Sequence, residues 1–386
     1  MKSVCFMKLF IILSLFVAGT SFASDHWPDN LRDDMENAAI AIADNWADDR
    51  DPTKQDWSWG EGVLAYGLIK TADWSGRSDF FNWVDDYLTH HQNEDPDIVW
   101  SDHCSPAISA FYISANISPE NEIYPIAEKV VNYIMTAPRT ESQNLLIHLG
   151  ERADVFPYNV AGFPDAWVDS LFHITVTLAQ YSKLTDNNEY IEEAIYQVDR
   201  FITNLQDPDT GLVAHAYFDY PENREVPAFS NDEFWARGNG WALVSLVELL
   251  SFMDENHPSR AALLNMTVRL EEALRNNQGS DGRYHTLVTK SSTYYETAGT
   301  ALILYAMAKG YELGIFPEST RLAVIEGAGS LLDNTIRWNW WKTQAVVKYT
   351  SIGTNPTPGL YRFVPRKSQV SYGNGAWMML AAEIVD

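Results

Sequence analysis

The 386-residue sequence has only two cysteines, Cys5 and Cys104, and no long apolar run beyond its first residues. If the N-terminal segment is removed, Cys104 stands alone, so an internal disulfide is excluded. The lack of about 18 uninterrupted apolar residues excludes a membrane-spanning helix. A chain of roughly 360 residues buries about three quarters of its surface, so its core can stabilise it without a disulfide.

Basic residues are scarce as well, because 27 Lys and Arg stand against 52 Asp and Glu, for a formal net charge of −25. Nucleic acids and anionic membrane surfaces are therefore disfavoured as partners. The charge does not exclude an anionic sugar, which a local pocket of Arg and His would still bind. It suits a salty environment, where ions screen the repulsion between surface carboxylates.

Metal-binding and phosphate-binding motifs are missing. The chain has no pair of neighbouring cysteines, no His-Glu-x-x-His and no EF-hand loop, so we predict no metal and no cofactor. It also has no Gly-x-Ser-x-Gly elbow and no glycine-rich phosphate loop after a strand.

The N-terminus is typical of a secretory signal peptide over residues 1–23. Lys2 and Lys8 form a basic start, residues 9–17 form an apolar centre, and Ser21-Phe22-Ala23 provides a small-residue cleavage site. Removing this segment brings the formal net charge to −27. We expect an exported protein, periplasmic or secreted, in which residues 24–386 form a single domain.

Apolar and amphipathic helices alternate along the rest of the chain, in an internal repeat of helical hairpins. Amphipathic helices are predicted over 31–47, 80–91, 259–276 and 319–333, and a more apolar one over 60–71. The apolar helices begin 43 to 76 residues apart, near Trp59, Asp102, Asp169, Arg237, Glu296 and Tyr372. Six apolar helices surrounded by six amphipathic ones predict an all-α fold, an (α/α)6 barrel.

In such a barrel every inner helix starts at the same rim, so residues far apart in the sequence converge around one cavity. The six starts include carboxylates, an arginine and aromatic residues, although tryptophan and arginine are not preferred N-caps. The rim is therefore where we expect function. A closed ring needs no partner, so we expect a monomer or a weak homodimer. Alternating runs at 284–288 and 346–350 are expected to form small hairpins.

Asp169 is the residue on which the candidate site centres. It follows Trp167 by two residues, where a proline-containing loop becomes an apolar helix. A carboxylate in a first helical turn is also favoured by the helix dipole and the free N–H groups, so capping is the alternative to catalysis. In the run 235–241, glycines on both sides of Asn239 permit close approach of a ligand or of another helix.

The runs 166–172 and 235–241 resemble those of the unsaturated rhamnogalacturonyl hydrolases, glycoside hydrolase family 105. They are also similar, less closely, to the unsaturated glucuronyl hydrolases of family 88. Further matches follow in order at 57–63, 102–103, 211–215, 295–301 and 372–375. The resemblance thus covers about residues 31–386.

This resemblance implies an enzyme that removes a Δ4,5-unsaturated uronic acid from the non-reducing end of an oligosaccharide by hydrating its double bond. Asp169 corresponds to the residue that donates a proton to C4 and helps water add at C5, and Asp102 to a second carboxylate. We expect a raised pKa for Asp169, because Trp167 and Trp241 would desolvate it and Asp102 would repel its charge.

The resemblance also implies roles in substrate binding. His215 corresponds to a histidine that holds water or substrate. His148, in the long loop 138–166, corresponds to a second family histidine and is also expected to bind substrate. Trp59 and Trp241 are expected to be sugar platforms, with core packing as the alternative, and Trp167 is expected to wall the cavity and bind substrate. Arg237 would meet the substrate carboxylate, orient Asp102 or stack on a tryptophan.

The expected substrate is an unsaturated uronyl-rhamnose oligosaccharide derived from ulvan or rhamnogalacturonan, and the acid-rich surface favours ulvan. Two alternatives remain from the residues alone. One is an inverting glycosidase or a polysaccharide lyase on the same barrel, since Asp102 and Asp169 would also serve an inverting mechanism. The other is a non-catalytic carbohydrate-binding barrel.

Overall fold

The computed structural model describes residues 26–118, 123–154, 164–219, 233–354, 356 and 359–386. The predicted signal peptide, residues 1–23, lies outside the described residues. Of the helices in the described ranges, none is both long and apolar enough to cross a membrane.

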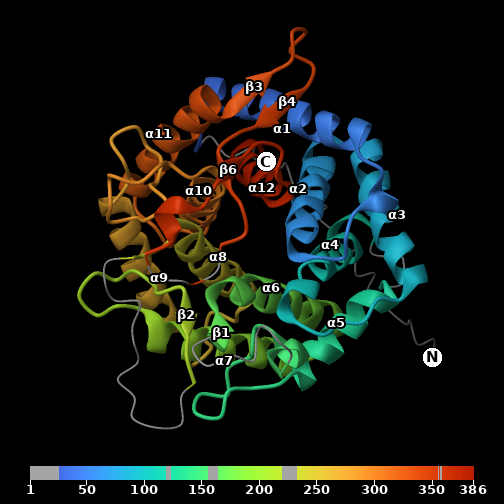
Figure 1. Ribbon diagram of the computed structural model, residues 1–386, viewed down its shortest axis with the longest axis vertical. Coiled ribbons are helices and arrows are strands. Elements are labelled where there is room, and N and C mark those ends of the chain that lie inside the picture. The colour runs from blue at the N-terminus through green and yellow to red at the C-terminus, as the bar shows by residue number, and fades with distance from the viewer. Residues whose placement is uncertain (1–25, 119–122, 155–163, 220–232, 355, 357–358) are drawn as a thin grey trace, which may run out of the picture.

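Helices alternate between an inner and an outer ring, as Figure 1 shows in a view down the barrel. The inner helices are α2 (Trp59–Ser75), α4 (Pro106–Tyr112), α6 (Val168–Thr185), α8 (Ala236–Phe252), α10 (Thr297–Glu312) and α12 (Ser371–Val385). The outer helices are α1 (Asp29–Asp49), α3 (Ser78–Glu94), α5 (Pro125–Thr136), α7 (Asn188–Leu205), α9 (Arg260–Asn276) and α11 (Glu318–Thr335). Each inner helix contacts the next, and α12 contacts α2 to close the ring. The prediction of an (α/α)6 barrel is confirmed.

The inner helices are buried on all sides and the outer helices on one face, as their apolar and amphipathic sequences predict. In α8 every residue from Ala236 to Leu250 is buried, because this helix packs against neighbours on all sides. In α7 the buried residues, among them Ala194, Val198 and Phe201, recur every three or four positions along one face. The core therefore lies between the rings and along the barrel axis.

Glycine permits the close contact between α2 and α12 that closes the ring. A Cβ atom on Gly67 would lie 2.5 Å from the carbonyl oxygen of Gly375, closer than any side chain tolerates. Because both residues lack a Cβ, the two backbones pack directly against each other.

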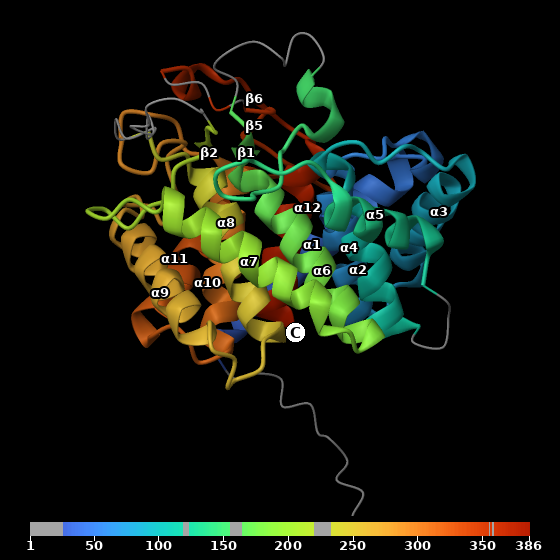
Figure 2. The ribbon, with the colours of Figure 1, turned by 90° about the horizontal axis from the view of Figure 1, so that it is seen from below.

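Short strands gather with the starts of the inner helices at one end of the barrel, the upper end in Figure 2. β1 (Ala166–Trp167) pairs with β2 (Ala216–Tyr217), and β5 (Thr350–Ser351) pairs with β6 (Arg366–Lys367). A third antiparallel pair, β3 (Ile336–Trp338) and β4 (Ala345–Val347), forms a hairpin after α11. β1 leads directly into α6, so pairing with β2 fixes the position of the first turn of α6.

The local predictions hold only in part. Residues 346–350 are divided between β4, which forms a hairpin with β3, and β5, which belongs to another sheet. Residues 284–286 pair antiparallel with 294–296, because the Thr286 N–H donates to the Tyr294 carbonyl and the Glu296 N–H to that of Tyr284, whereas Leu287 bridges to Trp235. Asp102 does not begin an α-helix, because it lies in a 3-10 turn and α4 starts at Pro106. Proline is favoured at the first position of a helix, where its missing N–H costs nothing.

Candidate active site

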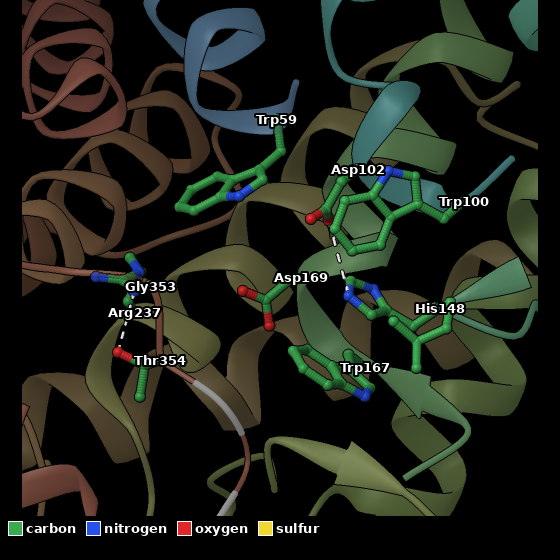
Figure 3. Close-up of a pocket in the computed structure, with 10 residues that line it drawn as sticks. Trp59, Trp100, Asp102, His148, Trp167, Asp169, Arg237, Gly353 and Thr354 are labelled. Atoms are coloured by element: carbon green, nitrogen blue, oxygen red, sulfur yellow. Dashed lines mark hydrogen bonds and ion pairs between the residues drawn. The ribbon is translucent and has the colours of Figure 1, made fainter. Parts of the chain in front are cut away.

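A cavity of about 180 Å³ opens at the rim where the inner helices begin. Figure 3 shows two aspartates facing this cavity between aromatic side chains. The lining residues are Trp59, Trp100, Asp102, His148, Leu149, Trp167, Asp169, Arg237, Gly353 and Thr354. Six of the eight residues predicted for the site are in this set, although they come from five separate segments of the chain.

Asp169 lies in the first turn of α6, but it does not cap the helix. The N-cap position belongs to Trp167, and the Asp169 carboxylate accepts a hydrogen bond from His215 Nε2 to Oδ2 at 3.0 Å. The capping alternative is therefore wrong, because the carboxylate turns to the cavity and to His215 rather than to the helix amides.

His215 is a partner of Asp169 and does not line the cavity, since its side chain is fully buried behind the carboxylate. A carboxylate only accepts hydrogen bonds, so Nε2 carries a proton. Nδ1 lies 3.0 Å from the hydroxyl of Tyr361, and the ring packs against Trp235 with centroids 4.2 Å apart. These contacts fix the ring and hence the orientation of the Asp169 carboxylate.

The pKa of Asp169 is lowered from its usual value, contrary to the prediction. Burial raises the pKa, but the charge and hydrogen bond of His215, with smaller contributions from His148 and Arg237, outweigh burial. The sequence could not reveal that His215 donates directly to this oxygen. Asp169 is consequently ionised at neutral pH.

Asp102 has the opposite protonation state. Burial, reinforced by the negative charge of Asp169 and only partly offset by Arg152, raises its pKa to about 8. Nε2 of His148 lies 3.7 Å from Oδ1 of Asp102. Asp102 is thus a protonated acid at neutral pH, and the pair of aspartates holds one proton.

His148 belongs to the cavity wall, as predicted, and it is a neutral ring. Burial lowers its pKa to about 3, so protonation near pH 7 is excluded. Nδ1 is 2.7 Å from the hydroxyl of Ser101 and 2.9 Å from that of Ser170, and the ring stacks on Trp167 with centroids 4.1 Å apart. His148 therefore connects the turn that carries Asp102 with the helix that carries Asp169.

Arg237 lines the cavity but uses its guanidinium within the protein. Nη1 donates to the backbone oxygen and the hydroxyl of Ser351, and Nη2 donates to the backbone oxygen of Ile352 and the hydroxyl of Thr354. The guanidinium also lies 4.4 Å from the ring of Trp235 and 3.7 Å from Glu296, not beside Asp102. Of the three predicted roles, stacking on a tryptophan is confirmed, orientation of Asp102 is wrong, and contact with the substrate carboxylate stays a prediction. Arg237 also holds the 351–354 segment at the cavity.

Trp59 and Trp167 line the cavity as predicted, whereas Trp241 does not reach it. Trp241 is fully buried and stacks on Phe172 with centroids 5.0 Å apart, so it is a core residue rather than a sugar platform. This corrects the prediction that Trp241 binds substrate and desolvates Asp169. Trp59 stacks on Tyr372 with centroids 4.2 Å apart, which fixes its ring at the cavity.

Comparison with known proteins agrees with this geometry. The sequence pattern of Glycosyl Hydrolase Family 88 matches residues 33–386. The chain belongs to this family. The predictions of a glycoside hydrolase and of an unsaturated uronyl hydrolase relationship are thereby confirmed, and a non-catalytic barrel is excluded.

Individual relatives are distant. The chain is similar to the unsaturated rhamnogalacturonyl hydrolase YesR of Bacillus subtilis, at 22% identity over 85% of this chain and 90% of that protein. It is 25% identical over 57% of its length to an unsaturated 3S-rhamnoglycuronyl hydrolase of Alteromonas, covering about half of that protein. Among solved structures, a family 105 glycoside hydrolase of C. acetobutylicum has 22% identity and a TM-score of 0.76, with 92% of this chain and 98% of that chain covered.

Within this family 88 hydrolase, sequence reasoning missed part of the cavity wall. Trp100, Leu149, Gly353 and Thr354 line the cavity but were not predicted. A signal for Trp100 was present, because Trp100 precedes Asp102 by two residues just as Trp167 precedes Asp169. No pattern marks Gly353 and Thr354, which reach the cavity through the hydrogen bonds of Arg237 to their segment.

The hydrolase has the groups for acid–base chemistry in one small enclosure. A protonated Asp102 and an ionised Asp169 face the same space, which Trp59, Trp100 and Trp167 also line. Within the described residues, no group of three or more His, Cys, Asp and Glu side chains is arranged to hold a metal ion.

Proposed function

We propose that this protein is an exported hydrolase that removes the Δ4,5-unsaturated uronic acid from the non-reducing end of uronyl-rhamnose oligosaccharides. One observation carries the proposal: the buried Asp102 and the partly exposed Asp169 face the same small cavity, and their surroundings raise the pKa of the first and lower the pKa of the second. Hydration of a double bond needs an acid that gives a proton to one carbon and a base that accepts a proton from water at the other.

The cavity suits a single terminal sugar. Its volume of about 180 Å³ is small, and Trp59, Trp100 and Trp167 surround the two carboxylates. Flat aromatic faces stack on the C–H faces of pyranose rings. An enzyme that binds the interior of a polymer needs a long groove, whereas a cavity of this small volume favours cleavage at a chain end.

The protonation states suggest a division of labour between the aspartates. Asp102 donates its proton to C4, which breaks the C4–C5 double bond and leaves oxocarbenium character at C5 and the ring oxygen. The ionised Asp169 stabilises this charge and accepts a proton from the water whose oxygen bonds to C5. Return of a proton from Asp169 to Asp102 restores the pair.

The product of hydration is a hemiketal at C5. When it opens, the bond between C5 and the ring oxygen breaks and C5 becomes a ketone. The released hemiacetal at C1 then loses the aglycone, which keeps the glycosidic oxygen. The enzyme thereby cleaves a glycoside without attacking its anomeric carbon. Neither aspartate needs a covalent bond to the sugar in this sequence.

The proposal also includes two more specific statements, that the protein is exported and that its substrate derives from ulvan. The basic, apolar and small-residue segments within residues 1–23 support export. The net charge of −25 suits a saline environment, and the name of the Alteromonas relative refers to a 3S-rhamnoglycuronyl substrate. The name of the Bacillus subtilis relative supports rhamnogalacturonan as the other source of substrate.

A substrate panel tests the proposed function. Unsaturated oligosaccharides prepared with ulvan lyase and with rhamnogalacturonan lyase are expected to lose the ultraviolet absorbance of the conjugated uronate when the enzyme is added. Higher kcat/KM on the ulvan series would support the ulvan assignment. A rise in absorbance on intact polymer would make the protein a lyase, and no change on any unsaturated oligosaccharide would refute the proposal.

A further inference from the structure

Two adjacent tryptophans at the tip of the β3–β4 hairpin are exposed to solvent. Trp340 is 88% exposed and Trp341 is 79% exposed, the highest values among the large hydrophobic side chains of the described residues. The structure buries or half-buries every other one of the 14 tryptophans. Large apolar side chains that gather in water mark surfaces that bind a partner, so the tip of this hairpin is a candidate binding surface.

Hydrogen bonds fix the turn that carries these two rings. The Lys342 N–H donates to the Asn339 carbonyl at 3.1 Å, and the Asn339 N–H donates to the Gln344 carbonyl at 2.9 Å. The Asn339 side chain accepts from the Thr343 N–H and donates to the Thr343 hydroxyl. Nε2 of Gln344 donates to Asp48 of α1 at 3.2 Å. Because the turn is already ordered, a ligand that stacks on its indoles loses little binding free energy to ordering of the backbone.

The hairpin lies on the outer wall of the barrel. It follows α11 and packs against α1, and in Figure 1 its turn projects beyond the ring of outer helices. The described lining of the catalytic cavity includes no residue of this hairpin. A ligand held by the hairpin is therefore a different one from the sugar that reacts.

A hollow of about 420 Å³ lies at the foot of the hairpin. Its lining residues are Asp34 and Asn37 of α1, Leu332 and Asp333 of α11, and Trp338 and Lys342 of the hairpin. The two carboxylates accept hydrogen bonds from hydroxyl groups, the ammonium group donates to them, and the amide does both. An aromatic ring beside several groups that bind hydroxyls is the combination that a sugar unit requires.

We propose that the β3–β4 hairpin, with the hollow at its foot, binds a polysaccharide chain. The C–H faces of neighbouring pyranose rings stack on Trp340 and Trp341, and hydroxyl groups of the same chain bond to the polar residues of the hollow. That this chain is the polymer from which the substrate is released rests on the proposed function. An enzyme held on that polymer meets unsaturated ends where a lyase produces them.

Charge disfavours two other occupants. Asp34 and Asp333 lie beside the hairpin in a chain of net charge −25, so an anionic membrane surface is repelled. A second copy of the chain presents the same carboxylates and the same charge, which opposes the pairing of two hairpins. An acidic polysaccharide is still accommodated at the tip, because residues 336–348 contain Arg337, Lys342 and Lys348 but no carboxylate.

Native electrophoresis in gels that contain intact ulvan or intact rhamnogalacturonan tests the proposal. At least one of the two polymers should retard the parent enzyme. Replacing Trp340 and Trp341 together with alanine should raise the apparent Kd for that polymer about tenfold or more. The matched control is Leu322→Ala, which truncates a side chain that is 57% exposed on α11 and should leave the Kd unchanged.

Activity measurements separate this inference from the proposed function. The double alanine variant should keep the parent melting temperature and the parent kcat on an unsaturated disaccharide, because neither indole lines the cavity. Asp169→Asn should keep the parent Kd for the polymer. Retardation of a parent enzyme that hydrolyses no disaccharide would support the site and refute only the proposed reaction.

Three results would overturn the site. The first is that neither polymer retards the parent enzyme, and the second is that the double alanine variant is retarded as strongly as the parent. The third is that the parent enzyme binds vesicles of phosphatidylglycerol, or self-associates in sedimentation velocity, and the double variant does not. That result would assign the two indoles to a membrane surface or to a second copy of the chain.

Discussion

Replacing Asp169 with asparagine is expected to lower kcat on an unsaturated uronyl disaccharide by at least about a thousandfold. Removal of a general acid–base group typically costs about a hundredfold to ten-thousandfold. Asp169 both accepts the proton from water and stabilises charge at C5, so we expect the larger effect. An asparagine keeps the size of the side chain and its acceptor for His215 Nε2, which lies 3.0 Å from Oδ2.

The control for this variant is Asp79→Asn, on outer helix α3 and paired with Arg77. Initial rates and melting temperatures should be measured for both variants. Asp79→Asn is expected to keep its rate, and Asp169→Asn is expected to remain folded. A folded Asp169→Asn enzyme with more than a tenth of the parent kcat would show that Asp169 is not the base.

The second large effect concerns Asp102 and pH. Its pKa is raised from 3.8 to about 8, so the acid form is present at neutral pH and is lost as the pH rises through about 8. Activity should therefore fall on the alkaline side with an apparent pKa near that value. Asp102→Asn removes the acid, so we expect kcat/KM at pH 7 to drop by about a hundredfold or more.

The pH profile of Asp102→Asn shows whether Asp102 is the group that titrates. Its residual activity should lack the alkaline fall seen in the parent enzyme, because asparagine does not ionise. Measurement of kcat/KM from pH 5 to about 10 for both proteins tests this. An unchanged alkaline fall in Asp102→Asn would assign that titration to another group.

The fold could be predicted because each helix start carries a local pattern. Apolar and amphipathic periodicity separates the rings, and positions near Trp59, Asp169 and Arg237 begin inner helices as expected. Since inner helices of such a barrel start at one rim, the meeting of Asp102, Asp169 and Trp59 followed from topology, whereas His148 was predicted only from the family resemblance. The exact bounds and the short strands did not, because they depend on contacts between distant segments.

The electrostatics of the site could not be predicted in this way. Whether burial or a neighbour decides the pKa of Asp169 depends on the position of His215, which comes from the segment before β2. Trp241 was predicted to line the cavity, but one turn of α8 separates it from Arg237 at the rim and places it in the core. Arg237 donates hydrogen bonds to the 351–354 segment, which is more than a hundred residues away in the sequence. No local sequence motif predicts these contacts.

The central claim is that the enzyme hydrates the double bond and does not attack the anomeric carbon. An analogue whose glycosidic oxygen is replaced by a methylene group keeps the double bond but has no glycosidic bond to cleave. Its ultraviolet absorbance should be followed with the parent enzyme and with Asp169→Asn. The account predicts that the parent enzyme alone removes the absorbance. A parent enzyme that consumes the natural disaccharide but leaves the analogue unchanged would contradict it.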